Sequence, residues 1–529
     1  MKILTADEMR EVDRLTTERQ GLPSLTLMEN AGKSVAGFIR HQFRKMRRRG
    51  IAVLCGKGNN GGDGLVVARH LLEMGAKPAV YLLAEPGEMR GDAAVNLKRW
   101  QDASRELRVI RDEREWRAAK AAVASADIVV DAILGTGARG EVEGLLREVI
   151  EDVNRHGPAQ TVVAVDIPSG ISSDTGEILG AAVTANFTIT FTAPKRGFFL
   201  GTAYQQVGQL IVREIGSGNE LIEEAGQGHL RWLEPRELAQ FAIPRDPAGH
   251  KGDYGHALIV AGSVGKSGAA VLASWAALRV GAGLVTVATP EPVLPIVANH
   301  TPEIMTEPLS ATETGSISLR SLEYERFYKL MVGKRVLAVG PGLSTHNETQ
   351  QFVRTIVGAR PPVPIILDAD ALNAYDGCAG ELKGSKEMVA LTPHPGEMAR
   401  LLGCTTSDVQ SRRLEVAQKA AADWDAFVIL KGHQTIIAAP NGQAWINSTG
   451  NPGMGTGGTG DVLTGMLAGL TAQFGAEAWW WTLGFGVYLH GLAGDLASAD
   501  VGQAPLIASD LIRSIPDAFQ HFFYELGRG

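Results

Sequence analysis

The sequence predicts an α/β protein of two domains, each with a parallel sheet between layers of helices. Three observations lead to this prediction. Short apolar runs alternate with helical patterns along the whole 529-residue chain. The runs are apolar almost without interruption, which indicates strands buried on both faces. The chain is also long enough for two or more domains.

The predicted strands form two series, and polar clusters follow most of them. The first series includes runs at 51–56, 126–135 and 161–170. The second consists of runs at 255–263, 335–344, 364–373, 388–397 and 426–435. Because ligands bind at the carboxyl ends of parallel strands, the polar clusters are candidate sites.

A polar, Gly-rich stretch at about 215–235 separates the two series. Such composition is typical of a boundary between domains. We therefore place the first domain at residues 1–222 and the second at 223–529. The halves share no matching motifs, so a duplication is not expected.

The composition excludes several classes of protein. Hydrophobic residues make up 45% of the chain and charged residues 21%, as in globular proteins. The net charge of −7 argues against nucleic acid or a membrane surface as partner. No apolar run reaches the roughly 20 residues of a membrane span, and the start of the chain lacks the pattern of a signal peptide. A cytoplasmic protein with small-molecule substrates is expected.

The three cysteines, Cys55, Cys378 and Cys404, are far apart in the sequence and lack metal-ligand spacing. They are expected to be thiols in a reducing compartment.

The first predicted strand leads into "GKGNNGGDG", which combines glycines and asparagines with Lys57 and Asp63. Glycines let a backbone approach a ligand closely, and a helix that starts after Asp63 would offer N–H groups to phosphate. The glycine spacing matches neither the usual nucleotide-fold fingerprint nor a Walker loop. A generic turn is the alternative.

Two further loops bear carboxylates after predicted strands. Asp131 precedes a Gly-Thr-Gly loop, and Asp166 is followed by Pro168, Ser169 and Gly170. Converging carboxylates and amides can hold a cation, and one carboxylate can act as a base.

In this order, "GNNGGDG", "LGTG" and "VDIPSG" resemble the N-terminal domain of the NAD(P)H-hydrate epimerase family, over roughly residues 1–220. The resemblance implies a Rossmann-like three-layer sandwich that interconverts the R and S epimers of hydrated NAD(P)H. It also implies a bound K⁺ held by Asn60, Asp131 and Ser169. The residues implied to hold the hydrated cofactor are Asn59, Asn60, Gly61, Gly62, Asp63, Gly135, Thr136, Gly137, Ala138, Arg139, Gly140, Glu141 and Asp166.

Asp166 is the candidate for proton transfer at C6 of the nicotinamide ring. Lys195, in "TAPKRG", is a second candidate, for which a surface lysine is the alternative.

In the second half, "GSVGKSGAA" contains Gly-Lys-Ser but is not a Walker loop, because Val260 stands where that loop requires glycine. Its small residues are expected to let a helix pack tightly or to admit a ligand.

The stretch "NPGMGTGGTGD", 451–461, is a glycine-rich loop before a predicted helix. Its backbone N–H groups can stabilise charge on a transferring phosphoryl group. Asp461 can then take the proton of the attacking hydroxyl. A simple helix cap is the alternative for Asp461.

This arrangement resembles the ribokinase-like superfamily, and more closely the ADP/ATP-dependent NAD(P)H-hydrate dehydratase family, over roughly 230–529. The closer resemblance rests on "HKGDYGHALIVAGS", "RVGAGLVTVAT", "LTPHPGE" and "NPGMGTGGTGDVLTG". It implies that the S hydrate is phosphorylated on its C6 hydroxyl and then loses phosphate. The residues implied to contact the hydrate are Ala269, Gly342, His394 and Asp461, and those for the nucleotide are Lys431, Gly432, His433, Gln434, Thr435 and Gly460.

ADP or ATP is the expected co-substrate, with Mg²⁺. The sequence departs from the family pattern at Lys266 and Ser267, where Met-Pro is common, and at Ser344, where Gly is frequent.

The aromatic stretch 478–497 contains three adjacent tryptophans, which cannot share one helix face. Core packing with a subunit interface is favoured over base stacking, so a homo-oligomer is expected. Taken together, the sequence predicts a bifunctional enzyme that repairs hydrated NAD(P)H. The alternative is a ribokinase-like kinase of a vitamin precursor, with a non-catalytic nucleotide-binding module in front.

Overall fold

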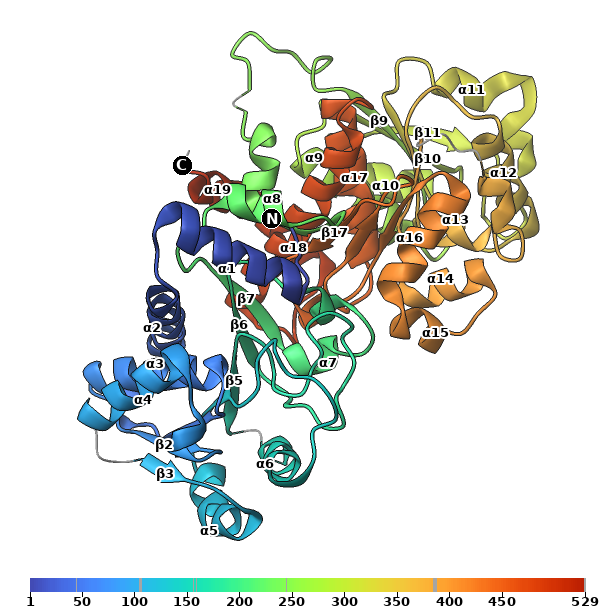
Figure 1. The fold of residues 1–529 in the computed structure, drawn as a ribbon. Helices are drawn as coiled ribbons and strands as arrows, with labels where there is room; N and C mark the ends of the chain where they lie inside the picture. The colour runs from blue at the N-terminus through green and yellow to red at the C-terminus, as the bar shows by residue number, and fades with distance from the viewer. Residues whose placement is uncertain are drawn as a thin grey trace. The chain divides into compact units, whose positions relative to one another are not determined.

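The computed structural model describes residues 1–43, 45–103, 107–155, 157, 159–243, 245–383 and 388–527. The chain divides into two compact units, Met1–Gly228 and His229–Gly529 (Figure 1). The boundary proposed at 222/223 falls inside helix α8 (Asn219–Ala225). Lys2 Nζ donates to the carbonyls of Glu223 and Gly226, at 2.7 and 2.6 Å, which ties this segment to the first unit.

The first unit is built on a sheet whose seven described strands are all parallel. In chain order the strands are β1 (Ile51–Cys55), β2 (Pro78–Leu82), β3 (Leu107–Val109), β4 (Ile128–Ala132), β5 (Thr161–Val165), β6 (Phe187–Phe191) and β7 (Gln209–Arg213). Their spatial order is β3-β2-β1-β4-β5-β6-β7, so the order reverses between β1 and β4. The runs at 51–56, 126–135 and 161–170 each contain a strand, as predicted.

Helices cover both faces of this sheet (Figure 1). One face packs on α2 (Ser24–Gln42), α3 (Asn59–Glu73) and α4 (Gly91–Ala103), through Val53 of β1. The other packs on α5 (Glu113–Ala124) and α6 (Gly144–Asn154), through Leu54. Successive residues of β1 thus pack on opposite helix layers, which confirms the three-layer sandwich. A smaller cluster joins α1 (Ala6–Gln20) to α8, and α7 (Tyr204–Val207) precedes β7.

The second unit contains a sheet of ten described strands. They are β8 (Leu230–Leu233), β9 (His256–Val260), β10 (Leu284–Pro290), β11 (Met305–Leu309), β12 (Val336–Val339), β13 (Ile365–Leu367), β14 (Val389–Leu391), β15 (Phe427–Leu430), β16 (Ile436–Ala438) and β17 (Ala444–Asn447). The spatial order is β11-β10-β9-β12-β13-β14-β15-β16-β17-β8. All five predicted runs of this half contain a strand.

Two strand pairs differ from the parallel arrangement that the sequence predicts. β16 runs antiparallel to both β15 and β17. The physical reason is the short connections, which can form hairpins but cannot hold the crossover that parallel neighbours require.

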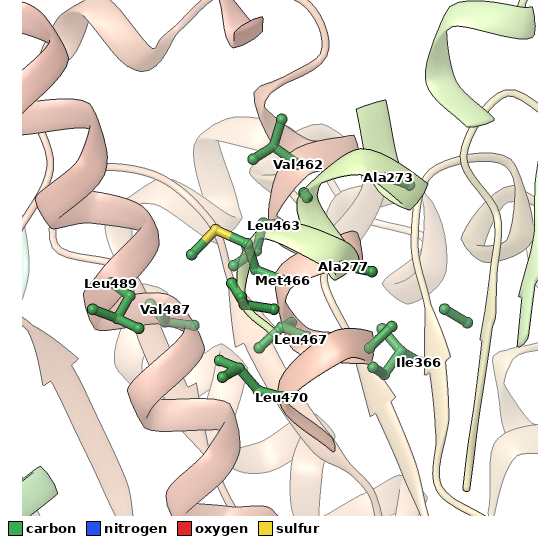
Figure 2. Close-up of a cluster of buried hydrophobic side chains, with 14 of the residues drawn as sticks. Ala273, Ala277, Ile366, Val462, Leu463, Met466, Leu467, Leu470, Val487 and Leu489 are labelled. Carbon is green, nitrogen blue, oxygen red and sulfur yellow. The ribbon is translucent and has the colours of Figure 1, made fainter. Parts of the chain in front are cut away.

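The helices of the second unit include α9 (Ser267–Arg279), α17 (Thr459–Phe474) and α18 (Trp479–Val501). A Cβ added to Gly465 of α17 would lie 1.9 Å from the Ala273 carbonyl oxygen of α9, so only glycine allows this approach. Figure 2 shows the surrounding apolar side chains of α17, among them Leu467. The prediction of a tightly packed small-residue helix is confirmed for α9. The remaining helices are α10 (Leu294–His300), α11 (Arg326–Leu330), α12 (Asn347–Gly358), α13 (Asp370–Asn373), α14 (Pro395–Leu402), α15 (Thr406–Ser411), α16 (Arg413–Trp424) and α19 (Ala508–Glu525).

The tryptophans at the start of α18 belong to this core. Trp479 is buried, and the Trp480 ring stacks on Trp445 with centroids 4.1 Å apart. Trp481 contacts the same Trp445 ring at 4.9 Å. The core packing is therefore confirmed. Over the described residues, no helix combines the length and the apolar character needed to cross a bilayer.

Candidate active sites

A cavity of about 690 Å³ lies at the carboxyl edge of the first sheet. The loops after β1, β4, β5 and β6 line it, together with side chains of α1. The cavity includes the point between β1 and β4 where the strand order reverses. Open α/β sheets bind their ligands at such a position.

The loop after β1 is itself the first turn of α3. The helix begins at Asn59, with Gly58 as its N-cap, so the prediction that it begins after Asp63 is wrong. The helix can begin this early because glycines let its first turn pack closely on the end of β1 and on α2. A Cβ on Gly61 would lie 1.9 Å from the Gly56 carbonyl oxygen, and one on Gly62 would lie 2.8 Å from Met28 Sδ.

Of the predicted residues in this turn, Asn59, Asn60 and Asp63 line the cavity, and Gly61 and Gly62 do not. Burial, and the negative charge of Asp166, raise the pKa of Asp63 well above its usual value.

Asn60, Asp131 and Ser169 meet at one place beside the Leu134 backbone. Asn60 Nδ2 donates to the Leu134 carbonyl at 2.9 Å, and Ser169 Oγ accepts from the Leu134 N–H at 2.8 Å. Ser169 Oγ also donates to Asp131 Oδ1 at 2.5 Å. Asn60 Oδ1 is buried and has no hydrogen-bond partner among the described residues.

Asp131 is fully buried. Burial raises its pKa to about 6, although the hydrogen bonds from Ser169 act in the opposite direction.

The loop after β4 contributes only its first part to the cavity. Gly135, Thr136, Gly137 and Ala138 line it. The other three predicted residues, Arg139, Gly140 and Glu141, are exposed and do not line it.

Asp166 and Lys195 form an ion pair on the cavity wall. Lys195 is 1% exposed, and its Nζ donates to Asp166 Oδ1, to Thr190 Oγ1 at 2.6 Å and to the Phe191 carbonyl at 3.2 Å. The alternative of a surface lysine is therefore wrong. In such a pair the carboxylate can accept a proton from a substrate, and the buried ammonium can donate one to it.

The turns after β5 and β6 share a strained conformation. Asp166 has φ of +67°, and the Ile167 N–H donates to the Val165 carbonyl at 2.8 Å. Thr192 has φ of +64°, and the Ala193 N–H donates to Phe191 at 2.7 Å. These are the features of classic γ-turns, which are rare and strained outside glycine. Strain of this kind is concentrated at functional sites.

Two residues of this wall, Thr192 and Asp13, were missed by the sequence reasoning. Nothing in the composition of a strand end indicates that Thr192 turns left-handed. Asp13 lies on α1, whose helical pattern does not reveal which face meets the cavity. Burial, and the charge of Asp166, raise the pKa of Asp13 to about 6, and Lys195 acts against them.

A second cavity, of about 720 Å³, lies at the carboxyl edge of the second sheet. Predicted residues from three segments line it together, namely His394, Lys431, Gly432, His433, Gln434, Thr435, Gly460 and Asp461. Glu397, which the sequence suggests as a phosphate or Mg²⁺ contact with His394, also lines it. So do Asp368 and His490, which were not among the predicted site residues.

Asp461 lies in the first turn of α17, after the N-cap residue Gly458. Gly458 has φ of +93° and no side chain caps the helix, so the structure does not support the cap alternative for Asp461. Burial, and repulsion from Asp368, raise the pKa of Asp461 to about 7 against the opposing effect of Lys431. A carboxylate of this kind is suited to accept a proton near neutral pH.

His394 caps its own helix, α14. Its Nδ1 accepts from the N–H groups of Gly396 and Glu397, at 3.0 and 3.3 Å, and the Glu397 carboxylate accepts from the His394 N–H at 2.8 Å. Burial lowers the pKa of His394. The ring therefore reaches the cavity as a neutral group that is fixed in place.

The other two predicted hydrate contacts, Ala269 and Gly342, lie together but do not line this cavity. A Cβ on Gly342 would lie 2.9 Å from Ala269 Cβ. They follow β9 and β12, the neighbours between which the strand order reverses.

The residues that depart from the family pattern lie close by. Asp370 Oδ2 accepts from Lys266 Nζ at 2.9 Å and from the Ser344 N–H at 2.8 Å. Ser344 has φ of +77°, the conformation that explains why glycine is frequent there.

Two α/β units, each with a cavity at the carboxyl edge of its sheet, define an enzyme with two sites. One site has a buried acid–base pair. The other has a carboxylate with a raised pKa beside a glycine-rich loop, an arrangement suited to phosphoryl transfer.

Comparison with known proteins identifies the family. Residues 257–517 match the family model described as NAD(P)H-hydrate dehydratase, and residues 24–197 match that of the YjeF-related protein N-terminus. The bifunctional NAD(P)H-hydrate repair enzyme Nnr of Moorella thermoacetica is 45% identical over 523 residues, covering 98% of this chain and 96% of the relative. That of Escherichia coli is 34% identical over 518 residues, covering 96% and 92%. The chain belongs to the family of bifunctional NAD(P)H-hydrate repair enzymes.

Among solved structures, an ADP/ATP-dependent NAD(P)H-hydrate dehydratase from Bacillus subtilis, co-crystallised with ATP and Mg²⁺, is 31% identical. The match covers 55% of this chain and 98% of that one, with a TM-score of 0.46. The full-length relatives favour the repair enzyme over a vitamin-precursor kinase with a non-catalytic first domain.

Proposed function

We propose that the first cavity interconverts the R and S hydrates of NADH and NADPH, and that the second returns the S hydrate to NAD(P)H at the expense of ADP or ATP. The observation that carries the first half is the buried Lys195–Asp166 pair. The observation that carries the second half is Asp461, a carboxylate with a pKa of about 7 at the end of a glycine-rich loop.

In the first site, inversion at C6 requires a group that takes the proton of the C6 hydroxyl and a group that returns a proton. Asp166 takes the proton of the C6 hydroxyl as the bond between C6 and N1 breaks, which leaves an aldehyde at C6, and Lys195 gives a proton to N1. N1 then attacks the other face of the aldehyde as both protons move back, so the pair ends unchanged. Asn59, Asp63 and the loop from Gly135 to Ala138 hold the hydrated ring against it. The exposed Arg139, Gly140 and Glu141 stay predictions as substrate contacts.

Asn60, Asp131 and Ser169 would hold K⁺. Their donor set fits a hard cation, because it consists of a carboxylate, a hydroxyl and the buried, unpartnered Asn60 Oδ1. When bound, the ion would neutralise Asp131 and fix the two neighbouring loops.

In the second site, Asp461 takes the proton of the C6 hydroxyl as the hydroxyl oxygen attacks the terminal phosphorus of the nucleotide. The bond from that phosphorus to the bridging oxygen breaks, and the nucleotide leaves with one phosphate fewer. The glycine-loop N–H groups and Lys431 stabilise the charge on the phosphoryl group. The phosphate then leaves C6 with its bonding electrons while C5 loses a proton, which restores the double bond of NAD(P)H. His394 lines the cavity that would hold the hydrate. Ala269 and Gly342, which do not line it, stay predictions as hydrate contacts.

Mg²⁺ would accompany the nucleotide. Over the described residues there is no group of three or more His, Cys, Asp or Glu side chains suited to a metal. Mg²⁺ commonly keeps several waters and binds mainly through substrate phosphates. The residues of the second cavity therefore fit an ion that arrives with the nucleotide.

Two expectations stay predictions. One is a homo-oligomer, for which the tryptophans of α18 give no evidence because they belong to the core. The other is the cytoplasmic compartment.

The test supplies the full chain with a mixture of R and S NADH hydrates, Mg²⁺, and either ADP or ATP, and follows recovery of the NADH absorbance. Complete recovery is expected. Recovery of the S fraction alone would contradict epimerisation, and no recovery with either nucleotide would contradict dehydration.

A further inference from the structure

A buried polar cluster at the edge of the second cavity is centred on Asp368, directly after β13. Its side chain is 1% exposed. Oδ1 accepts from Lys431 Nζ and from Thr392 Oγ1, both at 2.7 Å. Oδ2 accepts from Thr464 Oγ1, also at 2.7 Å. The donors come from the ends of β14 and β15 and from α17, so one carboxylate links three elements of the site.

The pair lies directly beside the backbone that precedes Asp461. A Cβ on Gly460 would lie 3.2 Å from Lys431 Nζ and 3.7 Å from Asp368 Oδ2. The Lys431 ammonium is thus held next to the turn whose N–H groups face the phosphoryl group. A lysine side chain has many rotamers, and an exposed one would not keep this place without a partner.

The charges around Lys431 explain why a partner is needed. Burial alone would lower the pKa of Lys431, but the charges of Asp368 and Glu397 raise it above its ordinary value. Glu397 Oε2 is 3.8 Å from Lys431 Nζ. In the described part of the chain, no ion pair involves Asp461. Asp368 therefore holds the ammonium that would otherwise be drawn to Asp461, the intended base.

We propose that Asp368 is a positioning residue of the dehydratase site, which fixes Lys431 beside the Gly460 backbone so that the ammonium meets the nucleotide phosphates while Asp461 stays available for the hydroxyl proton. The proposal rests on the proposed function of the second cavity. It assigns Asp368 no contact with substrate.

The groups that act on Asp461 set the sign of the expected pH effect. Asp368, Asp370 and Glu397 raise its pKa, and Lys431 lowers it. His490 Nε2, on α18, donates to the Thr459 carbonyl at 2.9 Å. Burial lowers the pKa of His490 to about 4, so the ring is neutral above that pH. Removing the charge of Asp368 removes one of the charges that raise the pKa of Asp461. It also frees Lys431 to approach Asp461. The pKa of Asp461 should then fall.

The test compares Asp368→Asn with Asp423→Asn in the full chain. Asp423 pairs with Lys419 at 2.6 Å on the surface, so the control makes the same substitution in an exposed ion pair. For Asp368→Asn, kcat for dehydration of the S hydrate should fall at least about tenfold, and the acidic limb of its pH profile should move to lower pH. Asp423→Asn should behave as wild type. Thr464→Val, which removes one hydrogen bond and no charge, should lower kcat less and leave the limb in place.

Two measurements keep the outcome interpretable. Thermal unfolding and epimerisation by the first unit report whether Asp368→Asn is folded. Carboxyl ¹³C NMR follows the titration of Asp461 without substrate. The Asp461 signal is assigned as the one that is missing from the spectrum of Asp461→Asn.

A signal that titrates near 7 in wild type and at lower pH in Asp368→Asn is expected. A folded Asp368→Asn whose signal and acidic limb match wild type would overturn the proposal. Absence of dehydration by the wild type, with the NMR shift present, would instead contradict the proposed function alone.

Discussion

The Ser169 hydroxyl donates to Asp131 Oδ1 at 2.5 Å, and the two residues belong to neighbouring strands and their turns. Beside them lies the unpartnered Asn60 Oδ1. Replacing KCl by choline chloride at constant ionic strength should therefore slow equilibration of the R and S hydrates. Dehydration of pure S hydrate should not change. Chiral separation of the hydrates over time gives the first rate, and NADH absorbance gives the second. Equal epimerisation in both salts would contradict a potassium site.

Asp166→Asn and Lys195→Met should each slow epimerisation by about 10²-fold, since each removes one half of the proton transfer. Lys120→Met is the matched control, because Lys120 is a half-exposed lysine of the same unit that pairs with Asp152 at 3.5 Å. The S hydrate should be dehydrated at the wild-type rate in all three variants, which shows that the second unit is intact. Unchanged epimerisation in Lys195→Met would remove Lys195 from the mechanism.

The dehydration rate should rise with pH between about 6 and 8. Burial and Asp368 raise the pKa of Asp461 to about 7, and only the ionised form can accept a proton. The rate should therefore follow the ionised fraction and level off above that pKa. A profile of kcat/KM for the S hydrate measures this dependence. A rate that is flat from pH 5 to 8 would mean that another group acts as base.

The raised pKa of Asp461 increases the dehydration rate as the pH rises, but it decreases the stability of the second unit over the same range. The folded state holds the Asp461 proton up to about pH 7, whereas the unfolded chain loses it near its ordinary value. Stability from this residue is thus present at low pH and is lost as the pH rises toward 7. Asp461→Asn should raise the Tm of the second unit by a few °C at pH 8, for a gain on the order of 2 kcal/mol. At pH 4 the difference should be close to zero.

Gly460→Ala should weaken nucleotide use, because its Cβ would lie 3.2 Å from Lys431 Nζ and displace the ammonium. We expect a loss of about tenfold in kcat/KM for the nucleotide, or roughly 1.4 kcal/mol. Gly457→Ala, in the loop just before α17, is the control, since a Cβ there meets nothing within 4 Å. Steady-state kinetics with varied ADP compare the two. Equal losses in both variants would indicate general stiffening of the loop.

The sequence predicts the strands and the glycine-rich loops well, and there is a physical reason for this. A strand buried on both faces leaves a continuous apolar run, and "IAVLC" is buried at every residue. A turn that brings backbone close to a strand end needs glycine, as at Gly61, where a Cβ would lie 1.9 Å from the Gly56 carbonyl oxygen. Both features are local, so they can be read without knowing what lies opposite in the fold.

Contacts between distant segments could not be predicted in the same way. Asp131 and Asp368 both follow or end an apolar run and look alike in the sequence. Only the fold shows that Asp131 accepts a hydrogen bond from a serine and Asp368 accepts one from a buried lysine. The left-handed turn at Thr192 is equally invisible, because a β-branched residue is the least expected there. The antiparallel direction of β16 depends on the short connections on both sides of it, not on its own residues.

The stack of Trp480 on Trp445 has a practical consequence for spectroscopy. Rings 4.1 Å apart and inclined by 25° couple their electronic transitions, which should give the second unit a distinct circular dichroism band. The first unit contains only Trp100 and Trp116 among the nine tryptophans of the chain. Loss of that band would therefore report the melting of one half, so the two halves could be followed separately in one intact molecule.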